Sequence, residues 1–238
     1  MKVLGIDTSG YANAVGVTDD ERILADFTFE AKTDSLEKIV SNIDFALKKA
    51  NLQLEDIQGF GVGLGPGSWT GIRVGVTVAK ILAYSTNKPV AGVPTLEVLA
   101  YNARNTPAQI CPIIYAGTKD TVYSAFYRTK NDTVTRVGEY YVGDLKGLSE
   151  RVKEPTVFTG ASAKACSQLI RQELGSSGID IEAIEGVPKG ATVALLAAIR
   201  LKRGESDDPL SLEPLYLKES TARAFLGSRY SRSAQVKK

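Results

Sequence analysis

A short polar stretch near the N-terminus, Asp7-Thr8-Ser9-Gly10, has the residue types of a phosphate-binding turn. Hydroxyl groups and a glycine at a hairpin tip can present backbone N–H groups to an anion, and the Asp7 carboxylate could hold magnesium through water. The same residues also form Asx and ST turns that bind no ligand. For this stretch alone the structural interpretation is favoured, and Asp7, Thr8 and Ser9 stay as candidates for nucleotide or phosphate binding.

A second candidate is the glycine-rich stretch Gly65-Pro66-Gly67-Ser68-Trp69-Thr70-Gly71, between a predicted strand and a predicted helix. Backbone N–H groups at a helix N-terminus bind anions. The stretch is not a P-loop, because no Lys-Ser/Thr pair closes it, and it lacks the third glycine of a dinucleotide fingerprint. A tight turn that needs positive φ explains the glycines equally well. The candidate phosphate-binding residues here are Gly65, Gly67, Ser68, Thr70 and Gly71.

The composition excludes several kinds of catalytic chemistry. The sequence has no histidine, and therefore no Ser-His-Asp or Cys-His triad and no histidine general base. A Cys/His zinc site cannot be built, so a metal would have to be a hard ion such as magnesium. Cys111 and Cys166 fall in predicted core elements, where we expect buried hydrophobes rather than nucleophiles. We therefore assign no catalytic residue and no metal ligand.

The elements that must position the two candidate stretches follow from hydrophobic periodicity. Residues 2–7, 12–18 and 22–30 read as three short strands separated by turn residues, which predicts an antiparallel meander. A helix is expected from Asp34, as its N-cap, to Asn51. Residues 59–65 then form a strand whose alternate positions are glycine, so its bare face admits a helix backbone or a ligand. The first half ends with a helix over 71–84, a strand over 89–93 and a helix over 95–103.

The second half repeats this order of strands and helices, although the residues themselves are not visibly repeated. Its expected strands cover residues 110–115, 121–128, 133–142, 156–159 and 179–184, and its expected helices cover 144–152, 161–173 and 191–202. Two such units make two mixed sheets with packed helices, an α/β architecture. This is the layout of the two-lobed actin-like ATPase fold, whose ribonuclease-H-like lobes face a cleft. We expect lobes over residues 1–104 and 105–219, followed by a basic tail over 220–238.

The predicted helix over 71–84 carries a stripe of small residues that recur every four positions. This helix is apolar nearly all round, which indicates burial on more than one side. The stripe could accept a partner helix at close distance, or it could lie against the core of its own chain, and the sequence leaves both open. The predicted partner interface consists of this stripe and the first helix, namely Leu36, Ile39, Val40, Ile43, Gly71, Gly75, Ala79 and Ala83.

Length, composition and charge set the wider frame. The 238 residues are 43% hydrophobic and 24% charged, which is typical of one large or two small globular domains. No apolar run reaches the roughly 20 residues of a membrane helix, and the two cysteines fit a reducing cytosol, so we expect a cytoplasmic protein without a membrane segment. The net charge is +2, but residues 220–238 hold five basic residues and no acid. We expect a flexible tail, with contact to RNA as the alternative.

Several motifs together resemble a known family. Leu4-Gly5-Ile6-Asp7-Thr8-Ser9 is similar to the opening of bacterial TsaB, the glycoprotease-like subunit of threonylcarbamoyladenosine biosynthesis. The stretch from Gly65 to Gly75 resembles the most distinctive TsaB motif, a Gly-Pro-Gly-Ser-aromatic-Thr-Gly run followed by an arginine. Two later landmarks match at Gly92-Val93-Pro94-Thr95-Leu96 and Leu215-Tyr216-Leu217. The resemblance spans Met1 to about Lys218.

The resemblance implies an actin-like fold and a role in tRNA modification. TsaB-like subunits pair with the catalytic paralogue TsaD and recruit the ATPase TsaE, and the complex attaches threonylcarbamoyl to the adenosine beside the anticodon. The implied function is a non-catalytic partner and scaffold that forms a homodimer when isolated and meets tRNA through the complex. No cofactor is assigned to the chain itself, and ATP with magnesium is left as a ligand of the complex. The alternative is a self-sufficient ATP-dependent transferase or kinase of the same fold.

Two departures from the family pattern lie near the expected cleft. The family often has a His-Ser pair entering the first helix, where this chain has Thr33-Asp34-Ser35. It often has Asp-Ala-Arg after the strand that opens the second lobe, where this chain has Tyr115-Ala116-Gly117. Both changes remove polar groups and argue against firm nucleotide binding or chemistry in the cleft. Family members generally use the first two helices for dimer contacts, which fits the small-residue stripe.

Overall fold

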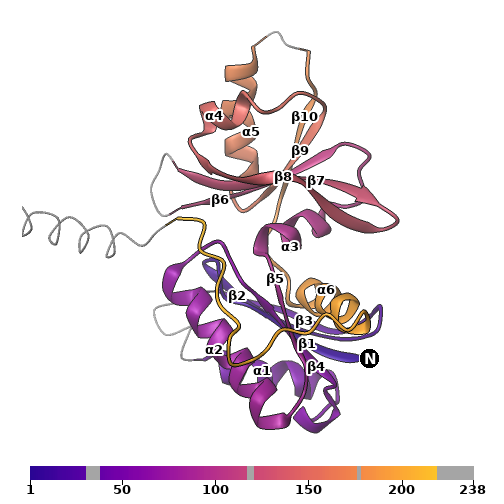
Figure 1. Cartoon of the computed structure of the whole chain (residues 1–238). Coiled ribbons are helices and arrows are strands. Elements are labelled where there is room, and N and C mark those ends of the chain that lie inside the picture. Colours follow the sequence, from indigo (N-terminus) through magenta and orange to yellow (C-terminus); the bar gives the residue numbers. More distant parts are fainter. Residues whose placement is uncertain (31–37, 117–120, 176–177, 219–238) are drawn as a thin grey trace, which may run out of the picture.

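The first five strands form one mixed sheet in the lower half of the molecule (Figure 1). The structure is a computed structural model that describes residues 1–30, 38–116, 121–175 and 178–218. The strands are β1 (Lys2–Asp7), β2 (Ala12–Asp19), β3 (Arg22–Glu30), β4 (Gly59–Gly63) and β5 (Val90–Val93), in the order β3-β2-β1-β4-β5. β1, β2 and β3 pair antiparallel, which confirms the predicted meander, and β4 and β5 continue the sheet in parallel.

The upper half repeats this topology with a second five-stranded sheet. Its strands are β6 (Gln109–Tyr115), β7 (Val122–Lys130), β8 (Thr133–Gly143), β9 (Thr156–Gly160) and β10 (Ile181–Glu185), in the order β10-β9-β6-β7-β8. β6, β7 and β8 pair antiparallel, and β9 and β10 pair in parallel beside β6. The duplicated mixed sheet confirms the fold class that the order of elements predicts.

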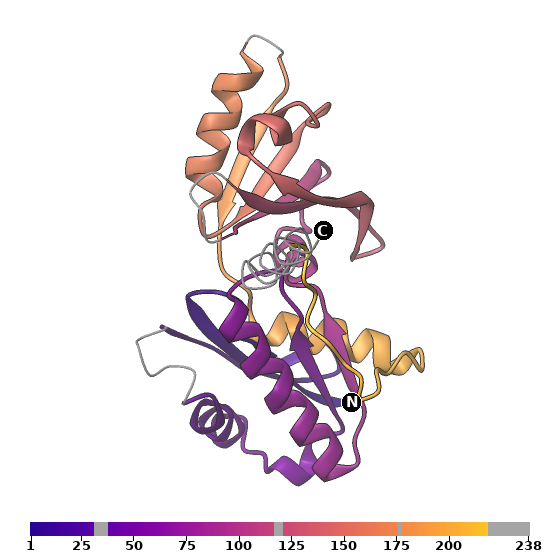
Figure 2. The ribbon, with the colours of Figure 1, turned by 60° about the vertical axis from the view of Figure 1, so that its left-hand side comes forward.

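Helices cover both sheets. The first sheet carries α1 (Ile39–Lys49) and α2 (Trp69–Thr86), with a short 3-10 turn η1 (Leu54–Asp56) between them, and the second carries α4 (Leu145–Ser149) and α5 (Ala163–Leu174). Figure 2 shows α2 running along the lower half of the molecule and α5 along the upper half. The predicted N-cap at Asp34 lies outside the described residues. None of the helices in the described ranges is long and apolar enough to cross a membrane.

The last helix of each half packs on the sheet of the other half. α3 (Thr95–Asn102) follows β5 in sequence but contacts β6 to β9, whereas α6 (Gly190–Lys202) follows β10 but contacts all five strands of the first sheet. The two helices meet where Thr192 Oγ1 donates a hydrogen bond to Asn102 Oδ1 over 2.6 Å. This exchange joins the halves at the level of their cores. The division of the sequence into 1–104 and 105–219 stays a prediction about the chain, because packing crosses that boundary twice.

Glycines on one face of the first sheet permit the close approach of α6. A Cβ on Gly61 would lie 2.6 Å from the Ala197 side chain, and Gly5 and Gly16 face the backbone of the first turn of the same helix. The other face of these strands is apolar and packs on α1 and α2. The sequence predicted a helix or a ligand over the bare glycine face, and the structure shows that a helix occupies it.

After α6 the chain returns across the lower half as an extended segment, residues 205–218, which we call the strap. Figure 1 shows the strap, in yellow, crossing beside α2 and rising to the junction of the two halves. It is fixed at Asp207, which bridges to Val90, and at Leu215, whose N–H donates to Leu64 O over 2.9 Å. Lys80 Nζ donates to the carbonyl oxygens of Leu210 and Leu212, both over 3.1 Å. These contacts hold the strap along α2.

Candidate functional site

The two predicted phosphate-binding stretches lie against each other at the top of the first sheet. Thr8 Oγ1 donates a hydrogen bond to Gly71 O over 2.7 Å, and Ser68 N donates to Ser9 O over 2.7 Å. Gly67 lies so close to Ser9 O that a Cβ at that position would collide with it. Gly65 has a φ of +92°, as expected for a tight turn from strand to helix. The turn after β1 and the entry to α2 therefore form one unit.

Asp7 is the buried anchor of this unit. Its side chain is 1% exposed, and its Oδ1 accepts hydrogen bonds from Ser9 N (2.8 Å) and Ser9 Oγ (2.6 Å). Its Oδ2 accepts from Thr95 Oγ1 over 2.9 Å. Burial raises the pKa of the Asp7 carboxyl above its usual value, and the hydrogen bonds from Ser9 and Thr95 oppose that rise. The bond from Ser9 N makes this an Asx turn, the structural interpretation that the sequence favoured for this stretch.

Only three of the candidate phosphate-binding residues reach the surface of the cleft between the halves. Ser9, Gly67 and Ser68 line it. Ser68 Oγ caps α2 by accepting a hydrogen bond from Gly71 N over 3.2 Å. The cleft lining does not include the remaining candidates, namely Asp7, Thr8, Gly65, Thr70 and Gly71. The hydroxyl groups of Thr8, Ser9 and Ser68 are thus already engaged by groups of the chain itself.

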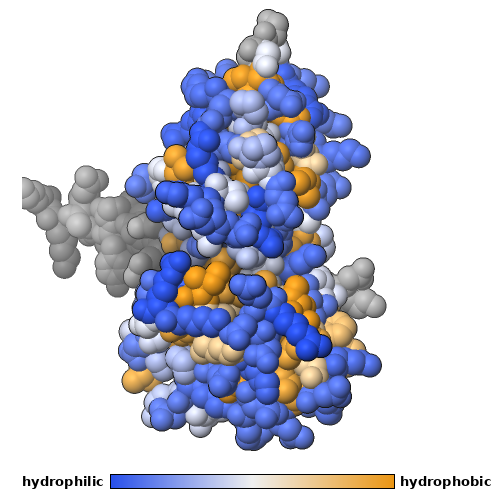
Figure 3. All heavy atoms as spheres, turned by 90° about the vertical axis from the view of Figure 1, so that its right-hand side faces the viewer, coloured by the Kyte–Doolittle hydropathy of each residue, from blue (hydrophilic) through white to orange (hydrophobic). Residues whose placement is uncertain are grey.

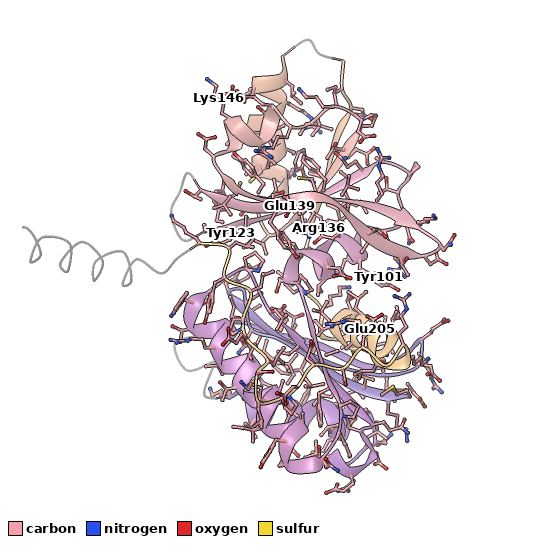
Figure 4. The ribbon with its side chains drawn as sticks, viewed as in Figure 1. Tyr101, Tyr123, Arg136, Glu139, Lys146 and Glu205 are labelled. Carbon is pink, nitrogen blue, oxygen red and sulfur yellow. The ribbon has the colours of Figure 1, made fainter. Side chains whose placement is uncertain are left out.

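The cleft itself is roomy, aromatic and nearly uncharged. Its volume is about 910 Å³, and both halves contribute to its walls. Tyr11 and Trp69 come from the lower half, and Tyr115 and Tyr123 from the upper half, where Figure 4 shows Tyr123 at the junction. Lys218, near the end of the strap, is the one charged residue among those described in its lining. Such walls suit a planar or apolar group better than a triphosphate with magnesium.

The cysteines contribute no nucleophile to this cleft. Cys111 is fully buried in β6, and burial raises the pKa of its thiol to about 12. Cys166 is buried in α5, where burial also raises its thiol pKa, and its sulfur contacts Tyr115 Oη at 3.5 Å. The expectation that both are core hydrophobes is confirmed. Among the described residues, no three His, Cys, Asp or Glu side chains are grouped so that they could hold a metal ion.

The small-residue stripe of α2 faces the core of its own half instead of a partner. Gly71, Gly75, Ala79 and Ala83 are all buried, and a Cβ on Gly75 would collide with Thr8 Oγ1. On α1, Ile39 and Ile43 are likewise buried in that core, and Val40 is exposed. Leu36 lies outside the described residues. The stripe lets α2 settle on β1 and β4, which is the second of the two interpretations left open by the sequence.

A different face of α2 is open to solvent. Ile81 is 60% exposed and Tyr84 is 68% exposed, and both follow Thr77 at helical spacing on the side away from the sheet. Val40 on α1 is a further exposed apolar side chain of this half. Large apolar side chains exposed one helical turn apart mark a candidate interaction surface. We call Thr77, Ile81 and Tyr84 the outer helix surface.

Sequence reasoning assigned no role to Tyr11 and Tyr123, and it placed Tyr115 near the cleft only as a departure from the family pattern. Tyr11 directly follows the Asp7 turn, and Tyr115 ends the strand of the second half that corresponds to β1. The signal was an aromatic residue next to the turn that follows the first strand of each half, but its meaning depends on the cleft, which only the fold creates. Lys218 was missed because the strap has no periodic pattern that would place it.

Hydrophobic side chains also gather just below the junction on the face that Figure 3 shows.

The duplicated mixed sheet, the exchanged helices and the cleft between the halves define a protein of the two-lobed actin-like ATPase fold. Solved structures agree. YeaZ from Pseudomonas aeruginosa matches 91% of this chain and 99% of its own with a TM-score of 0.75 and 23% identity. ROK hexokinase from Thermus thermophilus matches 85% of this chain and 100% of its own with a TM-score of 0.52 and 15% identity. At these identities the likeness concerns the fold.

Sequence relatives give the family. Residues 29–222 match the family model of TsaD, tRNA N6-adenosine threonylcarbamoyltransferase. The tRNA threonylcarbamoyladenosine biosynthesis protein TsaB of Bacillus subtilis is 31% identical over 227 residues, which cover 94% of this chain and 97% of that protein. The Escherichia coli protein of the same name is 29% identical over 133 residues, 55% of this chain and 57% of that protein. The chain belongs to the TsaB family, as its motifs predicted.

Proposed function

We propose that this chain is the non-catalytic subunit of a complex that adds threonylcarbamoyl to the adenosine next to the anticodon of tRNA. In this proposal it is the dimer partner and scaffold of the catalytic paralogue TsaD, and the complex recruits the ATPase TsaE. Membership of the TsaB family supports a role in making threonylcarbamoyladenosine in tRNA, because two relatives carry the name of tRNA threonylcarbamoyladenosine biosynthesis proteins. The lack of a positioned base, nucleophile or metal cluster among the described residues supports the non-catalytic role.

The observation that carries the non-catalytic role is the inward bonding of Asp7. In an ATP-dependent enzyme of this fold, a carboxylate at the end of the first strand would have to reach magnesium or its water. Here the Asp7 carboxylate is 1% exposed and accepts three hydrogen bonds from Ser9 and Thr95. Three of the roughly four acceptor sites of this buried carboxylate are already used by the chain itself, and Asp7 does not line the cleft.

For the partner surface, we propose the outer helix surface in place of the small-residue stripe. Ile81 and Tyr84 expose apolar area on α2, one of the two helices that the family resemblance implies for dimer contacts. TsaD is the occupant in the assembled complex, and a second copy of the chain is the occupant when the chain is isolated. Apolar anchors surrounded by polar residues such as Thr77 are typical of protein interfaces.

The test is co-purification of the chain with TsaD, together with light scattering of the chain alone. Ile81→Glu and Tyr84→Glu place a charge on the outer helix surface, and Leu169→Glu is the matched control on exposed α5 in the other half. We expect all three variants to melt like the wild type, the first two to lose TsaD and the homodimer, and the control to keep both. Normal pairing of folded Ile81→Glu and Tyr84→Glu would contradict the surface, and absence of TsaD pairing in the wild type would contradict the function.

A further inference from the structure

A groove with a volume of about 680 Å³ lies between α2 and the strap, on the outside of the lower half. It is lined by Trp69, Arg73, Val76, Thr77, Lys80, Leu212, Glu213, Pro214, Tyr216 and Lys218. Trp69 and Lys218 also line the cleft between the halves, so the groove opens toward the junction. We call it the strap groove. The groove shares Thr77 with the outer helix surface, and Tyr84 follows Lys80 by four residues on the same side of α2.

The strap groove has an excess of positive charge. Arg73, Lys80 and Lys218 line it, and Glu213 is the one acidic residue among the described residues of its lining. Lys80 is engaged with the carbonyl oxygens of the strap, but neither Arg73 nor Lys218 forms an ion pair with any residue that the structure describes. Residues 219–238, which continue from Lys218, add five basic residues and one acidic residue. Two cations that have no ion-pair partner among the described residues attract an anion.

Aromatic rings form a column beside these cations. The Trp69 and Tyr216 rings stack with centroids 4.2 Å apart and an interplanar angle of 29°, and the Arg73 guanidinium lies 5.2 Å from the Trp69 centroid. Trp69 and Tyr216 each remain 40% exposed despite this stacking. The column therefore offers ring surface to a further planar group at the same place where Arg73 and Lys218 offer charge.

We propose that the strap groove binds single-stranded RNA, with phosphates on Arg73 and Lys218 and a base stacked on the Trp69–Tyr216 column. Cationic grooves with exposed aromatic rings are the common design of single-strand binding, because every base has a face that stacks and every phosphate has a charge. An acidic peptide would satisfy the cations but would leave the exposed rings without a planar partner. The inference rests on the proposed function for the source of the strand, which is a loop of tRNA.

The experiment measures binding of a fluorescein-labelled oligoribonucleotide with the sequence of a tRNA anticodon loop to the full chain, by anisotropy. Trp69 is the sole tryptophan of the sequence, so quenching of intrinsic fluorescence reports contact at the column directly. The variants are Arg73→Glu, Lys218→Glu and Tyr216→Leu. Lys146→Glu is the control, because it makes the same charge reversal at an exposed position on α4 in the upper half (Figure 4).

We expect wild type and Lys146→Glu to bind the RNA with quenching of Trp69. Arg73→Glu and Lys218→Glu should each weaken binding and lower the salt slope by about 0.7. Tyr216→Leu should weaken binding roughly five- to hundredfold while the salt slope stays unchanged. A thermal melt of each variant checks that the strap groove is still folded.

Three outcomes would overturn the inference. The first is equal RNA binding by wild type and the groove variants. The second is RNA binding that leaves Trp69 unquenched and is matched by dextran sulfate, which would indicate a polyanion surface only. The third is tighter binding of a poly-glutamate peptide than of the RNA. Co-purification with TsaD is measured on the same variants, so loss of RNA binding with TsaD pairing intact supports the groove, whereas failure of the wild type to pair with TsaD concerns the proposed function alone.

Discussion

Thr95 donates a hydrogen bond to the Asp7 carboxylate over 2.9 Å, although the two residues are 88 positions apart in the sequence. The same Thr95 hydroxyl accepts a hydrogen bond from Gly65 N over 3.1 Å. Asp7 ends β1, Gly65 precedes α2, and Thr95 opens the exchanged helix α3. One buried hydroxyl thus joins the first strand, the glycine-rich turn and the helix that links the two halves.

Replacement of Asp7 should therefore destabilise the fold rather than a ligand site. Asp7→Ala leaves Ser9 N, Ser9 Oγ and Thr95 Oγ1 without their acceptor in a buried place, and each unsatisfied group costs about 1–3 kcal/mol. Asp7→Asn keeps one acceptor oxygen for Ser9 and should therefore reduce the free energy of unfolding by less than Asp7→Ala does. Urea denaturation measures both free energies of unfolding. If Asp7→Ala were as stable as the wild type, the carboxylate could not be the anchor of this unit.

Crowding or charging the small-residue stripe should also damage the fold. Gly75→Leu drives a side chain into Thr8, and overpacking alone costs roughly 1–3 kcal/mol. Ala79→Glu places an unpaired carboxylate at a fully buried position, so we expect it to unfold the lower half. Tyr84→Glu, on the opposite side of the same helix, is the control and should melt like the wild type. A normally folded Ala79→Glu variant would show that the stripe is not buried in the core of the lower half.

The stripe illustrates what periodicity can and cannot predict. The spacing of four residues predicted that another element lies close to Gly71 and Gly75, and the structure shows Thr8 in that place. The identity of the approaching group was beyond the sequence, because Thr8 comes from a turn more than sixty residues away. The glycines of β4 are a similar case, since periodicity predicted a bare face, and α6, from the other half of the chain, covers it.

The order of elements predicted both sheets correctly but could not predict the exchange of α3 and α6. Amphipathic patterning states that a helix has a buried face, and it does not state which sheet that face meets. The strap escaped prediction for another reason. Its position depends on backbone carbonyls at Leu210 and Leu212 held by Lys80, and backbone groups leave no trace in the choice of side chains.

Loss of the hydrogen bonds from Lys80 to the strap should change the fluorescence of Trp69. Lys80→Met keeps the apolar stem but removes the donor for two carbonyl oxygens, and a hydrogen bond from a charged group contributes about 1.5–3 kcal/mol. We expect lower thermal stability, faster proteolysis within residues 205–218 and a red shift of Trp69 fluorescence as Tyr216 moves away. Lys48→Met, which removes only an exposed pair with Asp44, is the control and should change none of these. An unchanged spectrum for Lys80→Met would mean that other contacts fix the strap.

Binding of ATP to the isolated chain should be weak or absent. The hydroxyls of Thr8, Ser9 and Ser68 are bonded to groups of the chain itself, and Lys218 is the single charged residue in the described lining of the cleft. Calorimetry with ATP and magnesium should give no binding with a Kd below 1 μM, which corresponds to about −8 kcal/mol. Sub-micromolar binding together with ATP turnover by the purified chain would favour the alternative of a self-sufficient transferase or kinase.

The most direct test of the central claim is the content of threonylcarbamoyladenosine in tRNA, measured by mass spectrometry in cells from which this chain has been removed. The account predicts that the modified nucleoside is lost and that the wild-type chain restores it. Cleft variant Ser68→Ala should also restore it, because the cleft carries no chemistry, whereas Ile81→Glu should not, because it cannot hold TsaD. An unchanged content of the modified nucleoside after removal of the chain would contradict the account, and so would full rescue by folded Ile81→Glu.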